Sequence, residues 1–173
     1  MARVFVAIPL STDLQEQASL IEDKLAHLPV RWLTGKNLHI TLVPPWEEPD
    51  TFAAIKLLDN LQGLGTFDIK LDHIALGPQP REPRLIWTRG QAPQELLDLK
   101  AAAEKVFGKT SEQRLYRLHA TLARFRSENY DENIFKDVPR TIRWKQKVES
   151  VVLMKSKLSN QGADYEILGK IDL

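Results

Sequence analysis

The chain contains no cysteine among its 173 residues, so disulfide bonds, thiolate zinc sites and a cysteine nucleophile are excluded. Its formal net charge is only +1, which argues against a protein coated in positive charge along a duplex but allows a local anion site. The chain also lacks a long hydrophobic run. The first run, residues 4–10, has the shape of neither a signal peptide nor a membrane span, so we expect a cytoplasmic protein without membrane contacts.

The composition is that of one globular unit. Hydrophobic residues make up 43% of the chain and charged residues 27%, which is typical of a folded domain. The length is close to that of one ordinary domain. We therefore expect residues 1–173 to form a single domain, with a monomer as the default state. Basic side chains are more frequent in the second half, and we interpret most of them as solvated surface.

Histidine is scarce, and two of the four histidines stand in the same frame. His39 begins His-Ile-Thr-Leu, and His119, eighty residues later, begins His-Ala-Thr-Leu. With nine threonines and twenty-five leucines, one such match is expected by chance about 0.03 times. The repeated motif therefore indicates a shared function. The other two, His27 and His73, lack a threonine two residues on, and we interpret them as a surface and a structural residue.

The hydrophobic pattern predicts an α+β fold. Strands are expected at residues 3–10, 37–43, 67–76, 84–90, 117–125, 142–158 and 163–173, and helices at 11–28, 50–61 and 93–107, with at most a short helix at 129–135. Pro44 and Pro45 are expected to end the first motif strand. Helix, connector and His-x-Thr strand occur twice in the same order, each followed by a helical segment and two strands. This order predicts an internal duplication with one motif per lobe.

Each motif is expected to place an imidazole and a hydroxyl on one face of its strand. Residues i and i+2 of a strand share a face, so His39 lies with Thr41, and His119 lies with Thr121. The residues between and beside them are apolar and anchor the opposite face. If the two lobes pack as pseudo-twofold mates, the two pairs face each other across a cleft.

Two imidazoles and two hydroxyls suit phosphodiester cleavage without a metal. One neutral histidine takes a proton from water, and the other, protonated, gives a proton to the departing oxygen. Both roles fit an ordinary pKa of about 6.5. The threonine hydroxyls can donate hydrogen bonds to the nonbridging phosphate oxygens in the transition state.

Two other classes of function are weighed against this interpretation. A metal hydrolase would use the histidines as zinc ligands, but catalytic zinc usually needs a third ligand, and neither motif has a carboxylate beside it. A non-catalytic protein that binds RNA or nucleotide phosphates would use the basic second half and the aromatics. Such a protein would not require both histidines to be paired with threonines. Activity in EDTA would dismiss the first alternative, and turnover the second.

These motifs resemble those of the two-histidine (2H) phosphoesterase superfamily. Within it, the chain is most similar to RNA 2′,3′-cyclic phosphodiesterases, also called 2′-5′ RNA ligases. The resemblance covers nearly the whole chain: residues 3–10 resemble the opening strand, 31–42 and 119–124 the two motifs, 83–90 the central tryptophan strand, and 156–168 the closing hairpin. It implies a bilobal α+β fold in which two pseudo-symmetric antiparallel sheets form a central cleft, with helices packed outside.

The resemblance also implies an activity, in RNA processing. The enzyme would hydrolyse a terminal 2′,3′-cyclic phosphate on RNA to a 2′-phosphomonoester without a cofactor or metal, and reverse ligation would be a minor activity at most. A small cyclic nucleotide is the alternative substrate. His39 and His119 would be the acid/base pair, and Thr41 and Thr121 would bind phosphate. We assign His119 to activate water and His39 to protonate the 3′ oxygen, although the sequence leaves the reverse direction open.

Six further residues are candidates for the cleft, and two of them, Trp87 and Tyr165, are expected to line either the cleft or the core. Arg124 matches the family's arginine, which implies a phosphate contact. Strict alternation from His119 puts it on the apolar side of the strand, so it needs a bulge or the strand end to reach the cleft. Arg117 lies two residues before His119 in the expected strand, so it is expected on the same face and is the other candidate to supply positive charge to the cleft. Phe5 is expected to line the cleft or the core, and Trp46 to stack on a base or, as we favour, to cap the core.

Overall fold

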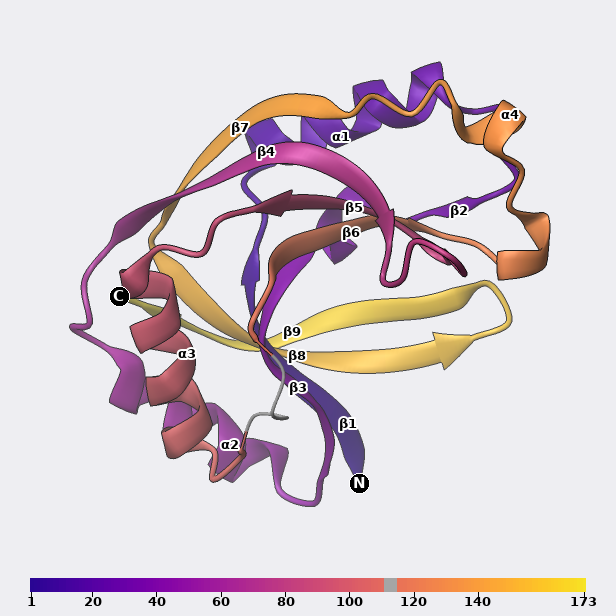
Figure 1. Ribbon diagram of the computed structural model, residues 1–173. Coiled ribbons are helices and arrows are strands. Elements are labelled where there is room, and N and C mark those ends of the chain that lie inside the picture. Colours follow the sequence, from indigo (N-terminus) through magenta and orange to yellow (C-terminus); the bar gives the residue numbers. More distant parts are fainter. Residues whose placement is uncertain (111–114) are drawn as a thin grey trace.

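The structure, a computed structural model, describes residues 1–110 and 115–173 as two antiparallel β-sheets with helices outside them (Figure 1). Sheet A has the strand order β3-β1-β8-β9, formed by β1 (Ala2–Pro9), β3 (His39–Glu48), β8 (Ser150–Ser159) and β9 (Gly162–Asp172). Sheet B has the order β2-β6-β5-β4-β7, formed by β2 (Arg31–Trp32), β4 (Phe67–Gly77), β5 (Leu85–Gly90), β6 (Leu118–Arg124) and β7 (Thr141–Val148). The α+β fold with two antiparallel sheets is confirmed.

The two sheets share a strand order around the motifs. In sheet A the His39 strand β3 pairs with β1, which pairs with β8; in sheet B the His119 strand β6 pairs with β5, which pairs with β4. The short β2, which the sequence did not predict, is added outside β6. This correspondence is what an internal duplication would produce, and the duplication itself stays a prediction.

The prediction of one long strand at 142–158 is wrong, because the chain leaves one sheet and enters the other at Glu149. β7 alternates between buried and exposed residues, as a strand with one solvated face does. β8 instead contains four consecutive buried residues, 151–154, because it lies between β1 and β9 and is covered on both faces. The change of pattern marks the crossing, and the hairpin of β8 and β9 is confirmed.

The expected end of β3 at Pro44 and Pro45 is also wrong. β3 continues to Glu48, because it is an edge strand that pairs only with β1. A proline on an edge strand removes no ladder hydrogen bond if its nitrogen faces outward or falls in a bulge. Here the register skips from Val43 to Trp46 while β1 advances by two residues, so the prolines occupy a β-bulge.

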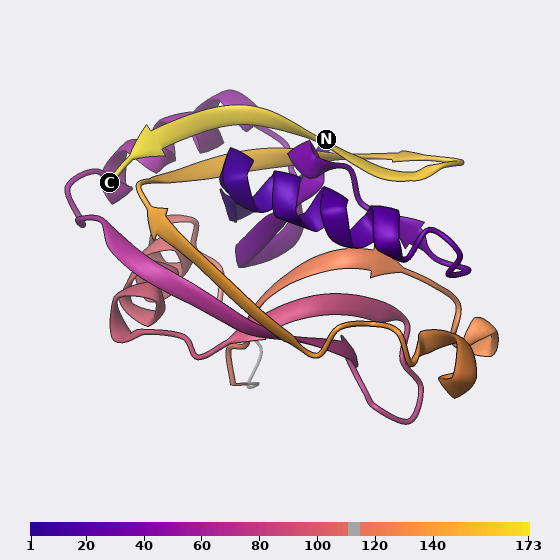
Figure 2. The same cartoon turned by 90° about the horizontal axis from the view of Figure 1, so that it is seen from above.

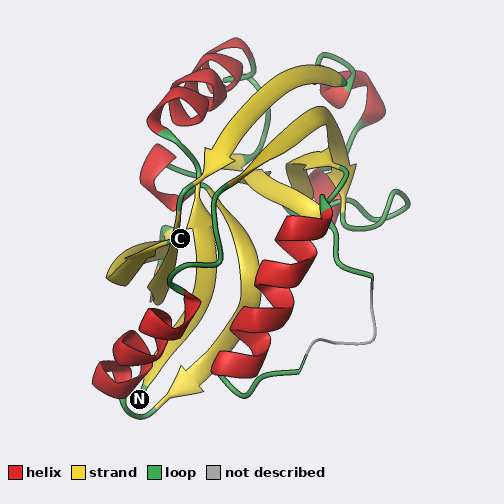
Figure 3. Ribbon diagram, turned by 90° about the vertical axis from the view of Figure 1, so that its left-hand side faces the viewer, coloured by secondary structure: helices red, strands yellow, loops and turns green. Residues whose placement is uncertain are grey.

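The helices lie on the outer faces of the sheets (Figures 2 and 3). They are α1 (Thr12–Lys24), α2 (Thr51–Leu57), α3 (Gln94–Val106) and the short α4 (Glu132–Phe135), with 3-10 turns η1 (Gly35–Asn37), η2 (Leu58–Leu61) and η3 (Ser127–Asn129). Ser11 caps α1 and Asp50 caps α2 by accepting backbone N–H bonds. α1 follows a strand of sheet A yet packs beside Trp144 of sheet B, whereas α3 follows a strand of sheet B and packs on β3.

Sheet A is apolar on both faces. Val4, Val6 and Ile8 of β1 belong to the main core beneath the helices. Phe5 and Ala7, which alternate with these residues, point to the other face, which we call the inner face of sheet A. There they form a separate cluster with Val152 and Met154 of β8 and the partly buried Tyr165 of β9. Phe5 is thus both a core residue, 2% exposed, and part of the face toward which His39 turns.

Candidate active site

His39 stands at the start of β3 on the inner face of sheet A. Its ring lies 4.9 Å from the ring of Phe5 and 5.2 Å, edge to face, from that of Tyr165. Its Nδ1 lies 2.7 Å from the carbonyl oxygen of Asn37. Asn37 is buried, and its Oδ1 accepts a hydrogen bond from the backbone N–H of Tyr165, which fixes the position of Asn37. Strand β9 therefore helps to fix the imidazole of β3.

His119 has matching surroundings in sheet B. Its ring lies 4.8 Å from the indole of Trp87 on the neighbouring strand, and its Nδ1 lies 2.7 Å from the carbonyl oxygen of Arg117. A carbonyl can only accept, so Nδ1 carries the proton in both histidines. Nε2 of each neutral ring is then left as an acceptor that can take a proton from water or, once protonated, donate one.

The alternation predicted for both motifs is confirmed. In each motif the histidine and the threonine are half-buried, whereas the leucine before, the residue between and the leucine after are buried. The two motif strands β3 and β6 contact each other although they belong to different sheets. The hydroxyl of Tyr116 donates a 2.8 Å hydrogen bond to the carbonyl oxygen of Thr41, which ties the approach to the second motif to the strand of the first.

Arg124 reaches the side of the site through a β-bulge. The partners of β6 on β5 are Trp87 for Thr121, Ile86 for Ala123 and Leu85 for Arg124. Leu122 is therefore an extra residue, and Arg124 shares the face of Thr121 and His119, because Leu85 shares the face of Trp87. The sequence analysis required a bulge or the strand end for Arg124 to reach the cleft, and the structure contains such a bulge. The charge of Arg124 acts on both histidines.

The first motif contains the same irregularity. Thr41 pairs with Ala7 and Val43 with Val6, so Leu42 is the extra residue of β3. Each His-x-Thr-Leu sequence thus ends in a bulge at its leucine. The position that Arg124 takes after the second bulge is taken by Pro44 after the first, so only the second motif supplies a cation there.

The electrostatics of the site favour the neutral form of both imidazoles. Burial lowers the pKa of His39 to about 4, and the charge of Arg124, together with that of His119 when it is protonated, adds to the effect. Burial also lowers the pKa of His119, together with the charges of Arg89, Arg117 and Arg124. An anion placed between these groups would oppose both effects, so the site is suited to a phosphate.

Arg89 is a site residue that the sequence did not single out. It pairs with His119 across β5 and β6 and therefore points to the same face. A signal was present, because Arg89 lies two residues after Trp87 on one strand. Trp46 is not at the site: its ring packs 5.4 Å from that of Phe107, as expected for a residue that caps the core.

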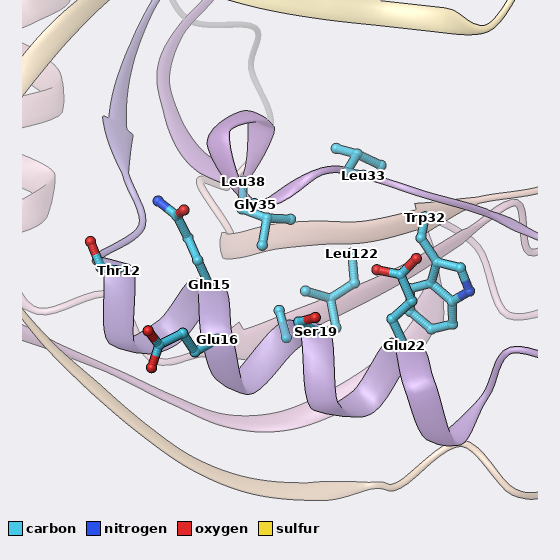
Figure 4. Close-up of a pocket in the computed structure, with 11 residues that line it drawn as sticks. Thr12, Gln15, Glu16, Ser19, Glu22, Trp32, Leu33, Gly35, Leu38 and Leu122 are labelled. Carbon is cyan, nitrogen blue, oxygen red and sulfur yellow. The ribbon is translucent and has the colours of Figure 1, made fainter.

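Two hollows lie near the motifs. One, of about 470 Å³, adjoins the site through Asn37, Tyr165 and Arg124 and extends along the β8–β9 hairpin. The other, of about 270 Å³, lies between α1 and β6 (Figure 4). Leu38 and Leu122 line it, and both point away from the motif face, so this second hollow is not part of the site.

Residues 1–110 and 115–173 contain no group of three or more histidine, aspartate or glutamate side chains that could hold a metal ion. Within the same residues no helix is long and apolar enough to cross a membrane.

Two antiparallel sheets that each present a His-x-Thr pair on adjoining strands define a two-histidine phosphoesterase fold. The chain belongs to the 2′-5′ RNA ligase superfamily, whose family model matches residues 13–160. It is 27% identical to the RNA 2′,3′-cyclic phosphodiesterase of Methanothermobacter thermautotrophicus, with 94% of each chain covered.

Solved structures agree in fold. A protein of Thermus thermophilus superposes with a TM-score of 0.78 at 21% identity, covering 99% of this chain and 97% of its own. Escherichia coli LigT in complex with 3′-AMP superposes with a TM-score of 0.74 at 25% identity, covering 99% and 98%. LigT has also been crystallised with phosphate, with a TM-score of 0.73 at 25% identity, covering 99% and 97%.

Proposed function

We propose that this protein is a metal-independent RNA 2′,3′-cyclic phosphodiesterase that forms a 2′-phosphomonoester. The observation that carries the proposal is the repeated geometry: two half-buried imidazoles on adjoining strands, each with Nδ1 bonded to a carbonyl and each beside a threonine. The archaeal relative bears the name of this activity, and the LigT complexes with phosphate and 3′-AMP show that a related fold binds nucleotide phosphates.

The reaction needs one base and one acid. Nε2 of one histidine takes a proton from water as the water oxygen bonds to phosphorus, and the bond from phosphorus to the 3′ oxygen breaks. Nε2 of the other, protonated, gives its proton to that oxygen, and the phosphate stays on the 2′ oxygen. His119 as base and His39 as acid stays our assignment. Substrate binding brings the negative charge that raises the lowered pKa of the acid.

Thr41 and Thr121 would stabilise the nonbridging oxygens, and Arg124 would neutralise their charge. Both hydroxyls share the histidine faces, and the bulge at Leu122 turns the guanidinium toward the same side. Preorganised donors of this kind are worth about 10² to 10³ in rate. With the 5′ hydroxyl of a second RNA in place of water, the same attack forms a 2′-5′ linkage as the bond from phosphorus to the 3′ oxygen breaks, so we expect weak 2′-5′ ligation as a side activity. We expect the protein to act as a monomer on cytoplasmic RNA.

The test is hydrolysis in excess EDTA of a short RNA that ends in a 2′,3′-cyclic phosphate. Mass spectrometry should show the addition of one water, and the phosphate should become sensitive to phosphatase and be located on the 2′ oxygen. His27→Ala is the matched control for histidine replacement, because His27 is a surface residue beside Asp137, outside the motifs. An RNA that stays cyclic at high protein concentration would refute the proposal, and a reaction that stops in EDTA would refute its metal independence.

A further inference from the structure

Arg89 is an arginine on the motif face of sheet B to which the proposed reaction gives no role. It is the direct cross-strand neighbour of His119, and its guanidinium lies over the indole of Trp87, 5.0 Å from the ring centroid. Trp87 in turn packs against the His119 ring. The side chain is therefore held beside the catalytic imidazole by stacking.

Within the described part of the chain, the guanidinium of Arg89 lacks a counter-charge. Its Nε atom is buried and has no hydrogen-bond partner, and neither Arg89 nor Arg117 has a carboxylate partner within residues 1–110 and 115–173. Arg117 lies two residues before His119, just ahead of β6, and its charge acts on His119. Its charge acts on Arg89 and, after burial, is the second cause of the lowered Arg89 pKa. Two like charges beside each other favour the binding of an anion between them.

The position of Arg117 places one end of this pair away from the threonine and the arginine that are proposed to hold the reacting phosphate. Arg117 directly precedes β6, and along the motif face of the strand the order is His119, Thr121 and, after the bulge, Arg124. An extended chain rises about 3.4 Å per residue, so the backbone of Arg117 lies roughly 7 Å from that of His119 and roughly 14 Å from that of Thr121. Thr121 and Arg124 are on one side of His119 and Arg117 is on the other, whereas Arg89 is level with His119 because the two residues pair directly.

The hollow along the β8–β9 hairpin is the competing place for a second phosphate, but three of its four cations already have partners, and the fourth, Arg124, is assigned to the reacting phosphate. Lys36 lies 2.8 Å from Asp164, Lys157 pairs with Glu166, and Arg31 donates to the carbonyl oxygen of Gln161 at 3.0 Å. Binding a phosphate there would require breaking these contacts. The pair of Arg89 and Arg117 offers donors without that cost.

We propose that Arg89 and Arg117 bind the phosphodiester that precedes the terminal nucleotide of the substrate. The proposal rests on the proposed function and refines it: the substrate is an RNA chain of at least two nucleotides, and a cyclic mononucleotide leaves the arginine pair empty. One phosphate would accept hydrogen bonds from two guanidinium groups, an arrangement for which arginine is well suited.

The test compares a 2′,3′-cyclic mononucleotide with a trinucleotide that ends in the same cyclic phosphate. In Arg89→Gln and Arg117→Gln, kcat/KM for the trinucleotide should fall about ten- to a hundredfold, and the loss should be at least about fivefold greater than for the mononucleotide. Arg81→Gln, in the exposed connection between β4 and β5, controls for the loss of one charge. Arg31→Gln tests the competing hollow.

Each result has one meaning. Equal losses on the two substrates would place the arginines at the reacting phosphate, and no loss would remove them from the substrate; both overturn the inference. A trinucleotide-specific loss in Arg31→Gln alone would also overturn it. If the unaltered protein hydrolyses neither substrate, the proposed function fails. The affinity for a trinucleotide with a terminal 2′-phosphate then decides: its salt slope should drop by about 0.7 in the double variant if one phosphate contact is lost, and an unchanged slope overturns the inference.

Discussion

His39 and His119 make the same hydrogen bond: each directs Nδ1 to the carbonyl oxygen of the residue two positions earlier, at 2.7 Å in both cases. Because this bond fixes the tautomer, Nε2 of each ring is the atom available to substrate. Replacing either histidine by alanine should lower turnover of cyclic RNA by about 10²- to 10⁴-fold. Circular dichroism and melting temperature should stay close to those of the unaltered protein, since both side chains are only half-buried.

The direction of proton transfer can be tested with the leaving group. A cyclic phosphate expels an alkoxide that needs a proton, whereas a nitrophenyl phosphodiester expels an anion that does not. If His39 is the acid, His39→Ala should keep a much larger share of its activity on the nitrophenyl ester than on cyclic RNA. His119→Ala, which lacks the base, should lose both activities alike. The opposite pattern would exchange the two roles.

The lowered pKa of both histidines predicts an acid-shifted rate profile. The free protein needs one neutral and one protonated imidazole, so kcat/KM should be bell-shaped, with its falling limb beginning below pH 6.5. Saturating substrate should move the limbs to higher pH, because bound phosphate raises the pKa of the acid. Initial rates at low and at high substrate concentration between pH 4 and 8 check both statements. A falling limb centred above pH 7 at low substrate would contradict them.

The same shift affects stability. His39 binds a proton more weakly in the folded chain than in the unfolded chain, so its contribution is complete above about pH 6.5 and is lost as the pH falls toward 4. Urea unfolding of the unaltered protein should therefore show a decline across this window that His39→Gln reduces. An identical decline in the variant would assign the acid sensitivity to other groups.

Tyr116→Phe should loosen the connection between the motifs. It removes the donor to the Thr41 carbonyl oxygen, at a cost of about 1 kcal/mol. For a chain of this length that corresponds to a fall in melting temperature of about 2–4 °C. Tyr130→Phe is the matched control, because Tyr130 is 38% exposed. Equal melting temperatures for the two variants would show that the Tyr116 bond contributes nothing measurable.

Gly77→Ala should disturb His119 through Trp87. A Cβ at Gly77 would overlap the indole of Trp87, so the ring that packs against His119 must move. Overpacking of this kind costs about 1–3 kcal/mol. We expect lower stability and slower turnover, and a recovery of stability in the double variant with Trp87→Phe, whose smaller ring leaves room. Additive losses in the double variant would argue against the contact.

The sequence was sufficient where a local pattern determined the structure. His39 and Thr41 share a face because strands alternate, and that rule holds wherever the strand is regular. It fails at Arg124, because a bulge is an insertion in one strand relative to its partner. The sequence shows that Arg124 needs a bulge to reach the cleft, but it does not show whether or where the bulge occurs. Its position follows only from the pairing of Thr121 and Ala123 with neighbouring residues of β5.

Long-range context explains the other differences. Pro44 and Pro45 usually end a strand, and only the edge position of β3 allows them to stay in one. Glu149 carries no turn signal, and the chain leaves one sheet for the other there because the burial of β8 differs from that of β7. Arg89 was overlooked because its significance lies in its cross-strand neighbour His119; the spacing from Trp87 indicates a shared face but does not identify that neighbour.

The crossing at Glu149 has a consequence for biosynthesis. β6 and all its partners in sheet B are complete once β7 has been made, whereas sheet A still lacks β8, its strand next to β1, and β9, which brings Tyr165 to His39. On the ribosome, the lobe of the second motif can therefore close before the lobe of the first, in the reverse of their order along the chain. Of the two motif histidines, the first to be synthesised is the last to reach its folded surroundings, and a chain that stops short of its final hairpin holds only half of a catalytic pair.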